Sequence, residues 1–248
     1  MIARSANPAL NKNTFTKVRD FALPDNLMTL QGTVNKTAIL LVLALLTASW
    51  VWRQFFTYEN PQVTLYIMVG VIGGLIAAMV AIFKPTTAPL VAPIYALLSG
   101  LFLGGISSFM EARFPGIVIQ AVGLTFGTLF ALLFAYKSGL IKATENFKLG
   151  VTAATGGIFM LYMVSFVLNL FGASVPFIHG NGIMGIGISG FIVVIAALNL
   201  VLDFDFIEEG VEQGAPKFME WRAALGLMVT LVWLYIEILH LLSKLRSR

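Results

Sequence analysis

The sequence predicts an all-α membrane protein with seven transmembrane helices, and three observations support this prediction. Of the 248 residues, 58% are hydrophobic and only 11% are charged, whereas an ordinary soluble domain has roughly 45–50% apolar and about 25% charged residues. Long stretches contain no Asp, Glu, Lys or Arg, and a bilayer core requires about 20 consecutive apolar residues in a helix. The alternating ten-residue segments of a membrane β-barrel are absent. Each span is therefore expected to be an α-helix, because lipid cannot satisfy an unpaired backbone group.

The uncharged stretches give the spans in chain order. They cover residues 37–52, 60–83, 85–110, 114–136 and 149–202. The last stretch is too long for one helix, and its Gly- and Pro-rich segment 171–182 predicts a loop between two spans. A final apolar segment, 223–243, is interrupted by Glu237 and His240 and gives the seventh span.

Prolines and glycines refine these elements. Pro85, Pro89 and Pro93 are expected to shape the start of the third span, with the regular helix beginning near Pro93. Small residues, as at 156–157 and 182–187, are expected to allow close contact between neighbouring helices.

The chain divides into a tail and a membrane domain. Residues 1–35 are polar and lack the apolar core and cleavage site of a signal peptide, so we expect a retained tail. Residues 36–248 are expected to form the seven-helix transmembrane domain. The net charge of +4 does not indicate a nucleic-acid partner, because the basic residues sit singly between apolar runs and in the two tails. The preference of Lys and Arg for the cytoplasmic side of a membrane explains this pattern.

Basic residues also predict the orientation. With the N-terminus in the cytoplasm, most Lys and Arg residues between the spans fall on the cytoplasmic side. Lys244, Arg246 and Arg248 fall on the opposite side. This mismatch leaves open a second arrangement, in which the seventh segment enters the membrane and returns instead of crossing it.

Several function classes are excluded by the residue types. The chain has no cysteine, which excludes disulfide frameworks, thiolate zinc sites and cysteine nucleophiles. It also lacks a His-Glu-x-x-His helix, a Gly-x-Ser-x-Gly elbow and a phosphate-binding loop that precedes a lysine. We therefore expect that the protein is not an enzyme and has no cofactor and no resident metal.

Acidic residues at the end of the sixth span are the first candidates for function, because a charged carboxylate in the bilayer centre costs about 2.5 kcal/mol or more. Helical geometry places four of them on one stripe, which is best interpreted as a water-facing helix end: Asp205, Glu208, Glu209 and Glu212. Asp203 lies on the opposite face among apolar and small residues. We therefore expect Asp203 to lie in the bundle interior.

The seventh span contains a second candidate, Glu237, on a stripe of polar and small residues that includes His240. Glu237 is expected to point inward. Alternatively, it pairs with a basic residue from a neighbouring helix end, such as Arg53 or Arg113. Asn199, one turn before Asp203, is expected to form an interhelical hydrogen bond, because an unpaired amide is costly in lipid.

Three motifs in order resemble the Bax inhibitor-1 family, also called the transmembrane Bax-inhibitor-motif family. They are the Ala-Pro-Ile-Tyr-Ala-Leu-Leu-Ser-Gly run within 92–107, Asp203-x-x-x-Ile207, and Leu-Tyr-Ile-Glu at 234–237. The resemblance is closest to a bacterial branch with a polar N-terminal tail and a Gly-Ala-Pro-Lys-x-Met-Glu-Trp segment, found here at 214–221.

The resemblance implies two three-helix layers around a central seventh helix, and a pH-sensitive calcium leak. In this family two aspartates on the sixth and seventh helices share a proton. Asp203 matches the first by position and Glu237 most resembles the second. The second acid is Glu here, and the sequence separation is longer than usual. Two straight helices would hold these carboxylates too far apart for one proton, so Glu220 is an alternative partner for Asp203.

The sequence therefore predicts a passive, proton-controlled cation channel, with Ca²⁺ as the expected ion, because hard divalent cations prefer carboxylate and carbonyl oxygen. Its pathway is expected to include Asp203, Asp205, Asn199 and Glu237, in a bacterial plasma membrane. The alternative is a regulatory membrane protein that binds a membrane protease or a cell-death factor through the tail and transports nothing.

Overall fold

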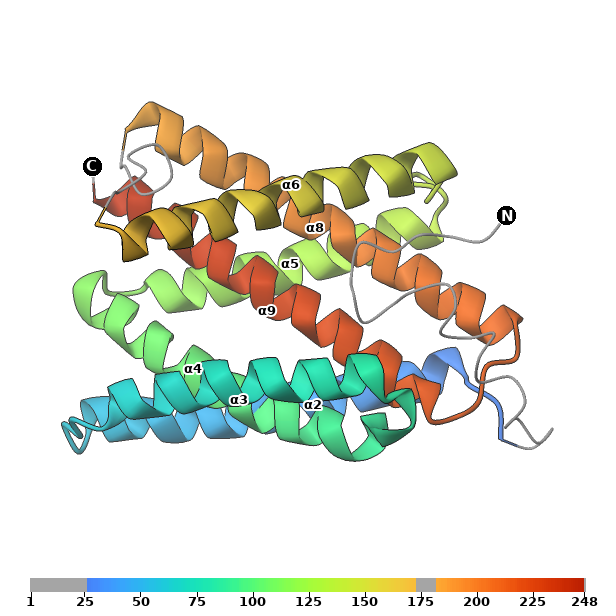
Figure 1. Cartoon of the computed structure of the whole chain (residues 1–248), viewed down its shortest axis with the longest axis horizontal. Coiled ribbons are helices and arrows are strands. Elements are labelled where there is room, and N and C mark those ends of the chain that lie inside the picture. Colours follow the sequence, from blue (N-terminus) through green and yellow to red (C-terminus); the bar gives the residue numbers. More distant parts are fainter. Residues whose placement is uncertain (1–25, 173–181, 248) are drawn as a thin grey trace.

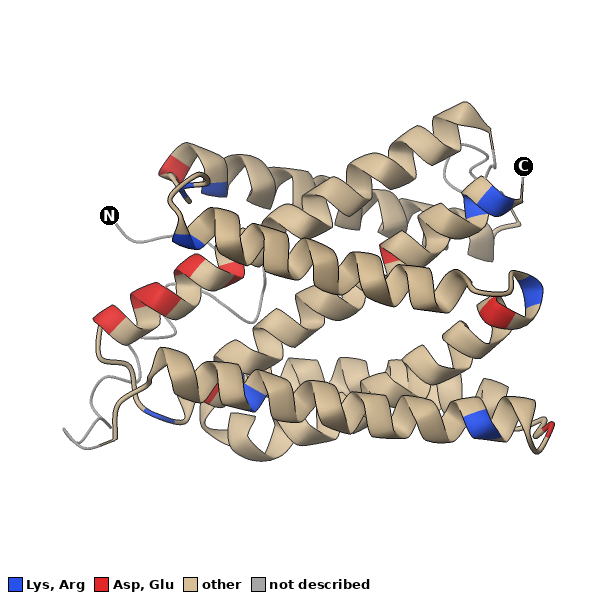
Figure 2. Cartoon of the chain, turned by 180° about the vertical axis from the view of Figure 1, so that it is seen from behind, with Lys and Arg blue, Asp and Glu red and all other residues tan. Residues whose placement is uncertain are grey.

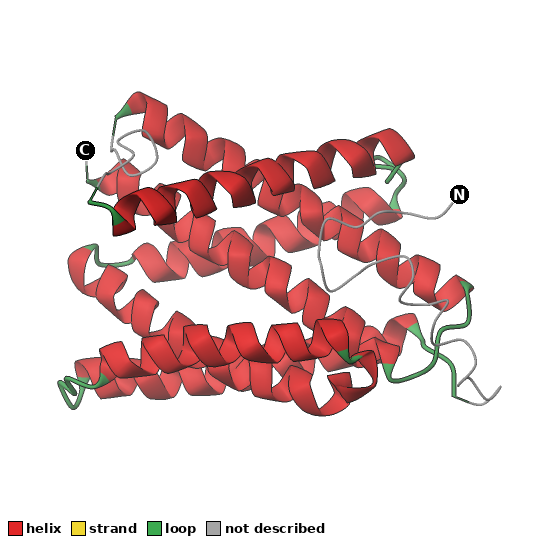
Figure 3. Cartoon of the chain, in the orientation of Figure 1, coloured by secondary structure: helices red, strands yellow, loops and turns green. Residues whose placement is uncertain are grey.

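Seven long helices make up the computed structural model, which describes residues 26–172 and 182–247. They are α2 (Leu30–Phe56), α3 (Val63–Phe83), α4 (Ala88–Arg113), α5 (Ile117–Lys137), α6 (Glu145–Leu170), α8 (Ile183–Glu212) and α9 (Met219–Arg246). All seven are long and apolar enough to cross a membrane. Within the described ranges, the rest of the chain is loop, turn and one short 3₁₀-helix, η2 (Pro85–Thr87), without any strand (Figure 3). The prediction of an all-α, seven-span membrane protein is confirmed.

The helices form two layers with α9 between them (Figure 1). One layer contains α2, α3 and α4, and the other contains α5, α6 and α8. The central helix α9 contacts α2, α4, α5 and α8, and it is the most deeply buried of the seven. Its side chains join the main hydrophobic cluster through residues such as Leu227, Leu234 and Ile238. This arrangement agrees with the one that the family resemblance implies.

The bundle has two ends. We call the end where α2, α4, α6 and α9 begin the proximal end, and the opposite end, where these helices finish, the distal end (Figure 1). α9 is one continuous helix, and near its C-terminus Lys244 donates to the Gly185 carbonyl and the Ser189 hydroxyl at the start of α8. Arg246 donates to the Pro115 carbonyl at the α4–α5 turn. The seventh segment therefore crosses the bundle once, and the entering-and-returning alternative is wrong.

The starts of α2 and α4 are among the predicted boundaries that differ from the structure. α2 begins at Leu30, inside the segment assigned to the polar tail, because the Thr29 hydroxyl accepts a hydrogen bond from the Gly32 amide and caps the helix there. α4 begins at Ala88, so Pro93 lies inside the helix rather than at its start. Pro89 occupies the first turn of α4, where a backbone amide would have no acceptor within the helix, so its missing N–H breaks no helical hydrogen bond.

Close contact between α4 and α2 depends on two glycines. A Cβ added to Gly100 would overlap the Ala44 carbonyl oxygen, and one on Gly104 would lie 2.6 Å from the Ala48 carbonyl oxygen. This Gly-x-x-x-Gly spacing allows the two backbones to meet. Four of the glycines predicted to serve this purpose do not do so, since a Cβ would meet open space there: Gly156, Gly157, Gly182 and Gly187. Small side chains permit close contact, but a second helix must also lie within reach.

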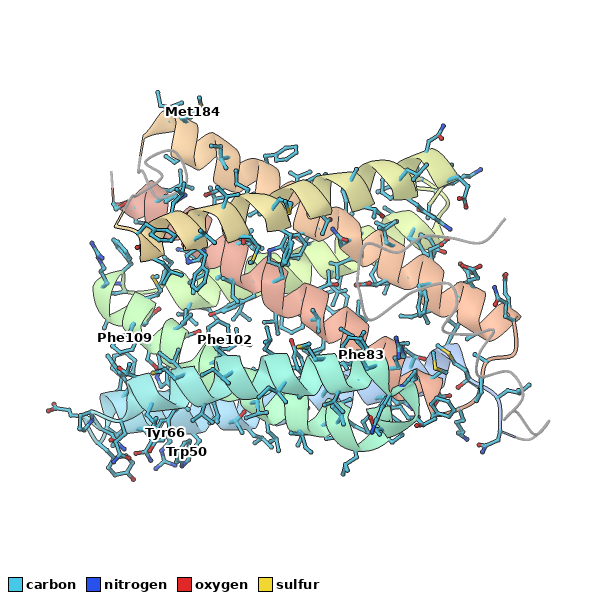
Figure 4. All side chains as sticks on the ribbon, in the orientation of Figure 1. Trp50, Tyr66, Phe83, Phe102, Phe109 and Met184 are labelled. Carbon is cyan, nitrogen blue, oxygen red and sulfur yellow. The ribbon has the colours of Figure 1, made fainter. Side chains whose placement is uncertain are left out.

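Charged residues gather toward the two ends of the bundle, with few between (Figure 2). At the distal end, Trp50 of α2 and Tyr66 of α3 lie side by side on the outside (Figure 4), with ring centroids 5.1 Å apart. Tryptophan and tyrosine favour the membrane–water boundary. The exposed apolar residues between these ends, such as Leu75 and Ile76, form a surface suited to lipid.

Candidate functional site

Asp203 lies in the interior of the bundle, with 0% of its surface exposed. It belongs to the most continuously buried part of α8, which runs from Asn199 to Phe204. One turn before it, the Asn199 side-chain amide donates to the Thr155 hydroxyl of α6 at 2.8 Å and to the Ile195 carbonyl at 2.8 Å. This interhelical hydrogen bond was predicted, and it holds α8 against α6 at the level just distal to Asp203.

The acidic stripe at the proximal end of α8 is only partly water-facing. Glu208 is exposed and accepts a hydrogen bond from the Tyr136 hydroxyl. Asp205 is half-buried, and its carboxylate pairs with the Lys148 ammonium of α6 at 2.5 Å. Lys148 is itself buried, and its role was not apparent from the sequence, where it follows a turn and resembles an ordinary loop lysine. The Asp205–Lys148 pair therefore holds α6 against α8, six residues closer to the proximal end of α8 than Asn199.

Glu237 is also buried, with 4% of its surface exposed. One carboxylate oxygen, Oε1, accepts hydrogen bonds from the Tyr162 hydroxyl at 2.7 Å and from the Trp233 indole at 3.1 Å. The predicted partner Arg113 instead lies over the Phe114 ring, 5.4 Å from its centroid, and His240 is exposed one turn away. Two neutral donors from α6 and α9 therefore orient this carboxylate.

Asp203 and Glu237 lie at different depths in the bundle. At 1.5 Å per residue, Asp203 is about 14 Å from the proximal end of α8 at Glu212, whereas Glu237 is about 27 Å from the start of α9 at Met219. In addition, Trp233, one turn before Glu237, packs against Ile192 and Ile195 on the distal side of Asp203. The two carboxylates are therefore more than about 10 Å apart along the bundle axis, which is too far to share one proton.

Glu220 does not replace Glu237 as a partner of Asp203. Its fully buried carboxylate receives hydrogen bonds from the amide and the hydroxyl of Thr29, both at 2.9 Å, and forms an ion pair with Lys36. Lys36 also lies over the Trp221 ring, 5.5 Å from its centroid. Gly32 provides the space for this carboxylate, because any Cβ at that position would overlap it. Glu220 therefore fastens the start of α9 to the start of α2.

A second buried charge that the sequence did not reveal is Arg222. Its guanidinium donates to the Ala81 carbonyl at 2.9 Å and to the Ile82 carbonyl at 3.3 Å. These carbonyls belong to the last turn of α3, which has no amide donors of its own to satisfy them. In the sequence, Arg222 lies between the family motif at 214–221 and the predicted span 223–243, so it resembles an ordinary basic residue at a helix end.

The acidic end of α8 borders a cavity. This proximal cavity has a volume of about 690 Å³ and is lined by α2, α5, α8 and the α5–α6 loop, with Asp205, Glu208 and Tyr136 among the polar groups. A smaller cavity of about 200 Å³ lies toward the distal end and is almost wholly apolar. Leu41 and Phe126 line both cavities. No group of three or more His, Asp or Glu side chains suited to a metal ion occurs within the described ranges.

The remaining predicted contact, between a partner protein and the polar tail, falls mainly on residues 1–25, which lie outside the described residues.

Comparison with known proteins identifies one family. The sequence model of the family described as Bax inhibitor 1 like matches residues 7–247. Comparisons with curated proteins and with solved structures gave no match. Because the family match covers nearly the whole chain, this protein belongs to the Bax inhibitor 1 like family.

Proposed function

We propose that this family member is a passive cation leak, with Ca²⁺ as the ion, and that protonation of interior carboxylates controls the flow. The observation that carries the proposal is the burial of Asp203 and Glu237 in a membrane bundle. An acid at this depth is costly and commonly marks an ion or proton pathway. Carboxylate oxygen is also the ligand type that Ca²⁺ prefers.

The geometry supports two separate carboxylate levels rather than one proton-sharing pair. The proximal level contains Asp203, next to the Asp205–Lys148 ion pair that borders the larger cavity. The distal level contains Glu237, oriented by Tyr162 and Trp233. An ion would meet these levels in sequence, and protonation of either would remove a negative charge from the path.

We place the protein in a bacterial plasma membrane with the proximal end in the cytoplasm. This orientation is supported by the excess of basic residues at the proximal end, because Lys and Arg favour the cytoplasmic side of a membrane. Since α9 crosses the bundle, the basic residues of its last turn, Lys244 and Arg246, lie at the opposite end. A cysteine introduced at Ser247 and labelled from each side would test this orientation, because the chain has no other cysteine.

Calcium flux in liposomes tests the leak. The purified protein is reconstituted with an internal calcium dye, and Ca²⁺ entry is measured from pH 6 to pH 8. We expect entry that varies with pH, and a flatter pH profile for Asp203→Asn. For Glu237→Gln we expect a change in rate of about tenfold, equivalent to about 1.4 kcal/mol in the barrier.

Matched controls are two exposed acids, Glu145→Gln at the proximal end and Glu59→Gln at the distal end. They remove the same charge and are expected to leave the flux unchanged. Flux that ignores pH and both interior substitutions would refute proton control, and no flux above that of protein-free liposomes would refute the leak itself.

A further inference from the structure

The two cavities lie end to end between α2 and α5 and share Leu41 and Phe126, and we call them together the groove. On α2 its lining positions recur every three or four residues from Leu30 to Trp52, and on α5 they run from Val118 to Lys137. The α2 stretch is about 33 Å long at 1.5 Å per residue, close to the thickness of a bilayer core, about 30 Å. α9 forms the floor through residues such as Leu227 and Leu231. The groove is therefore long enough to extend through both leaflets.

The proximal half of the groove is the roomier half. It corresponds to the proximal cavity of about 690 Å³, and it narrows into the smaller apolar cavity where Leu41 and Phe126 line both. This junction lies about 16 Å from Leu30 along α2, which is roughly the depth of one leaflet. The proximal cavity thus has the depth of one lipid acyl chain.

Two lysines stand at the mouth of this half. Lys137 ends α5 and Lys142 lies in the α5–α6 loop, and both are exposed and line the cavity. The cavity also contains two carboxylates, but Asp205 is paired with Lys148 and Glu208 accepts from Tyr136. Among the described residues, no carboxylate forms an ion pair with either Lys137 or Lys142. The mouth therefore carries two lysine cations against the one carboxylate, Glu208, that has no ion-pair partner among the described residues, which leaves a net positive charge at the level of lipid headgroups.

We propose that this groove binds an anionic phospholipid. The phosphate lies between Lys137 and Lys142, and one acyl chain follows α2 and α5 inward to Leu41 and Phe126. Basic pockets between transmembrane helices are suited to anionic headgroups. An acyl chain in the groove gives the apolar side chains that line it van der Waals contacts that an empty space would not provide. The site shares the proximal cavity with Asp205 of the proposed leak, but it requires neither Asp203 nor Glu237.

Native mass spectrometry of the full chain tests the proposal. The protein is released from vesicles that contain equal amounts of phosphatidylglycerol and phosphatidylcholine, and the bound lipids are counted. We expect one retained phosphatidylglycerol. The double substitution Lys137→Gln and Lys142→Gln is expected to weaken its binding about 25-fold, since each lysine near an anionic lipid contributes roughly a fivefold factor.

The matched control is Lys84→Gln with Lys217→Gln, which removes the same charge from the same end of the bundle outside the groove. It is expected to retain the lipid. A second variant, Ala38→Trp, fills the groove from α2 while keeping both lysines, and it is expected to release the lipid. Melting temperatures of all variants verify that they are folded.

Three outcomes would overturn the proposal. Equal loss of phosphatidylglycerol from the double variant and from its control would indicate that the total positive charge of the proximal end, and not the groove, attracts the lipid. Unchanged phosphatidylglycerol binding by Ala38→Trp would show that the acyl chain lies outside the groove. A dimer that disappears in Ala38→Trp would show that a second copy, not a lipid, covers the groove.

Discussion

Replacement of Lys36 by methionine is expected to lower the free energy of unfolding by about 3 kcal/mol or more, because it leaves the buried Glu220 carboxylate without its counter-ion. Glu220 has no exposed surface, and within the described ranges its remaining donors are the amide and the hydroxyl of Thr29. The measurement is thermal or denaturant unfolding of the purified protein in a mild detergent. Lys84→Met, at an exposed lysine of the same end, is the control and is expected to change stability by less than about 0.5 kcal/mol.

A double-mutant cycle separates the ion pair from the packing of the lysine stem. Glu220→Gln removes the charge and keeps an oxygen that the Thr29 groups can bind. If the ion pair is the cause, the combination of Lys36→Met and Glu220→Gln should be more stable than the sum of the single effects by about 2 kcal/mol. Strictly additive effects would show that Lys36 acts through packing alone.

The Gly100→Ala substitution is expected to destabilise the protein by about 1–3 kcal/mol, because the added methyl group overlaps the Ala44 carbonyl of α2. Backbone atoms cannot rotate away as a side chain can, so α2 and α4 must separate. Gly104→Ala should add a similar cost through the Ala48 backbone. Unfolding of each variant in detergent measures the effect.

Glycines of α5 provide the control for this experiment. A Cβ on Gly123 or Gly127 would meet nothing within 4 Å. Alanine at either position is therefore expected to be neutral or slightly stabilising, since it has the better helix propensity by up to about 1 kcal/mol. Comparable losses at Gly100 and Gly123 would contradict the close α2–α4 contact.

The helices were predictable from the sequence because each span must be apolar over its own length, a property that is local in the chain. The depth difference between Asp203 and Glu237 was predictable for a related reason. α8 and α9 are each one continuous helix, so residue number converts directly into height. The inward face of Asp203 followed from the same helical periodicity.

The polar contacts between helices were not predictable in this way. The Glu220–Lys36 and Asp205–Lys148 pairs join residues that are far apart in sequence, and their geometry depends on how α9 crosses α2 and how α6 lies on α8. In the sequence, Lys36 and Lys148 each stand directly before an uncharged stretch, a position that does not indicate a partner. The prediction of glycine contacts failed for the same reason, since Gly100 and Gly156 cannot be told apart in the sequence and only Gly100 lies against a neighbouring backbone.

The central position of α9 has a consequence for biosynthesis. The two helix triplets are made before α9 leaves the ribosome, and they share few contacts with each other except through it. Until Glu220 and Arg222 enter the membrane, Lys36 and the last carbonyls of α3 therefore lack these partners. A nascent chain that stops before Met219 would leave two unjoined triplets with unmet polar groups, the kind of product that cellular quality control removes.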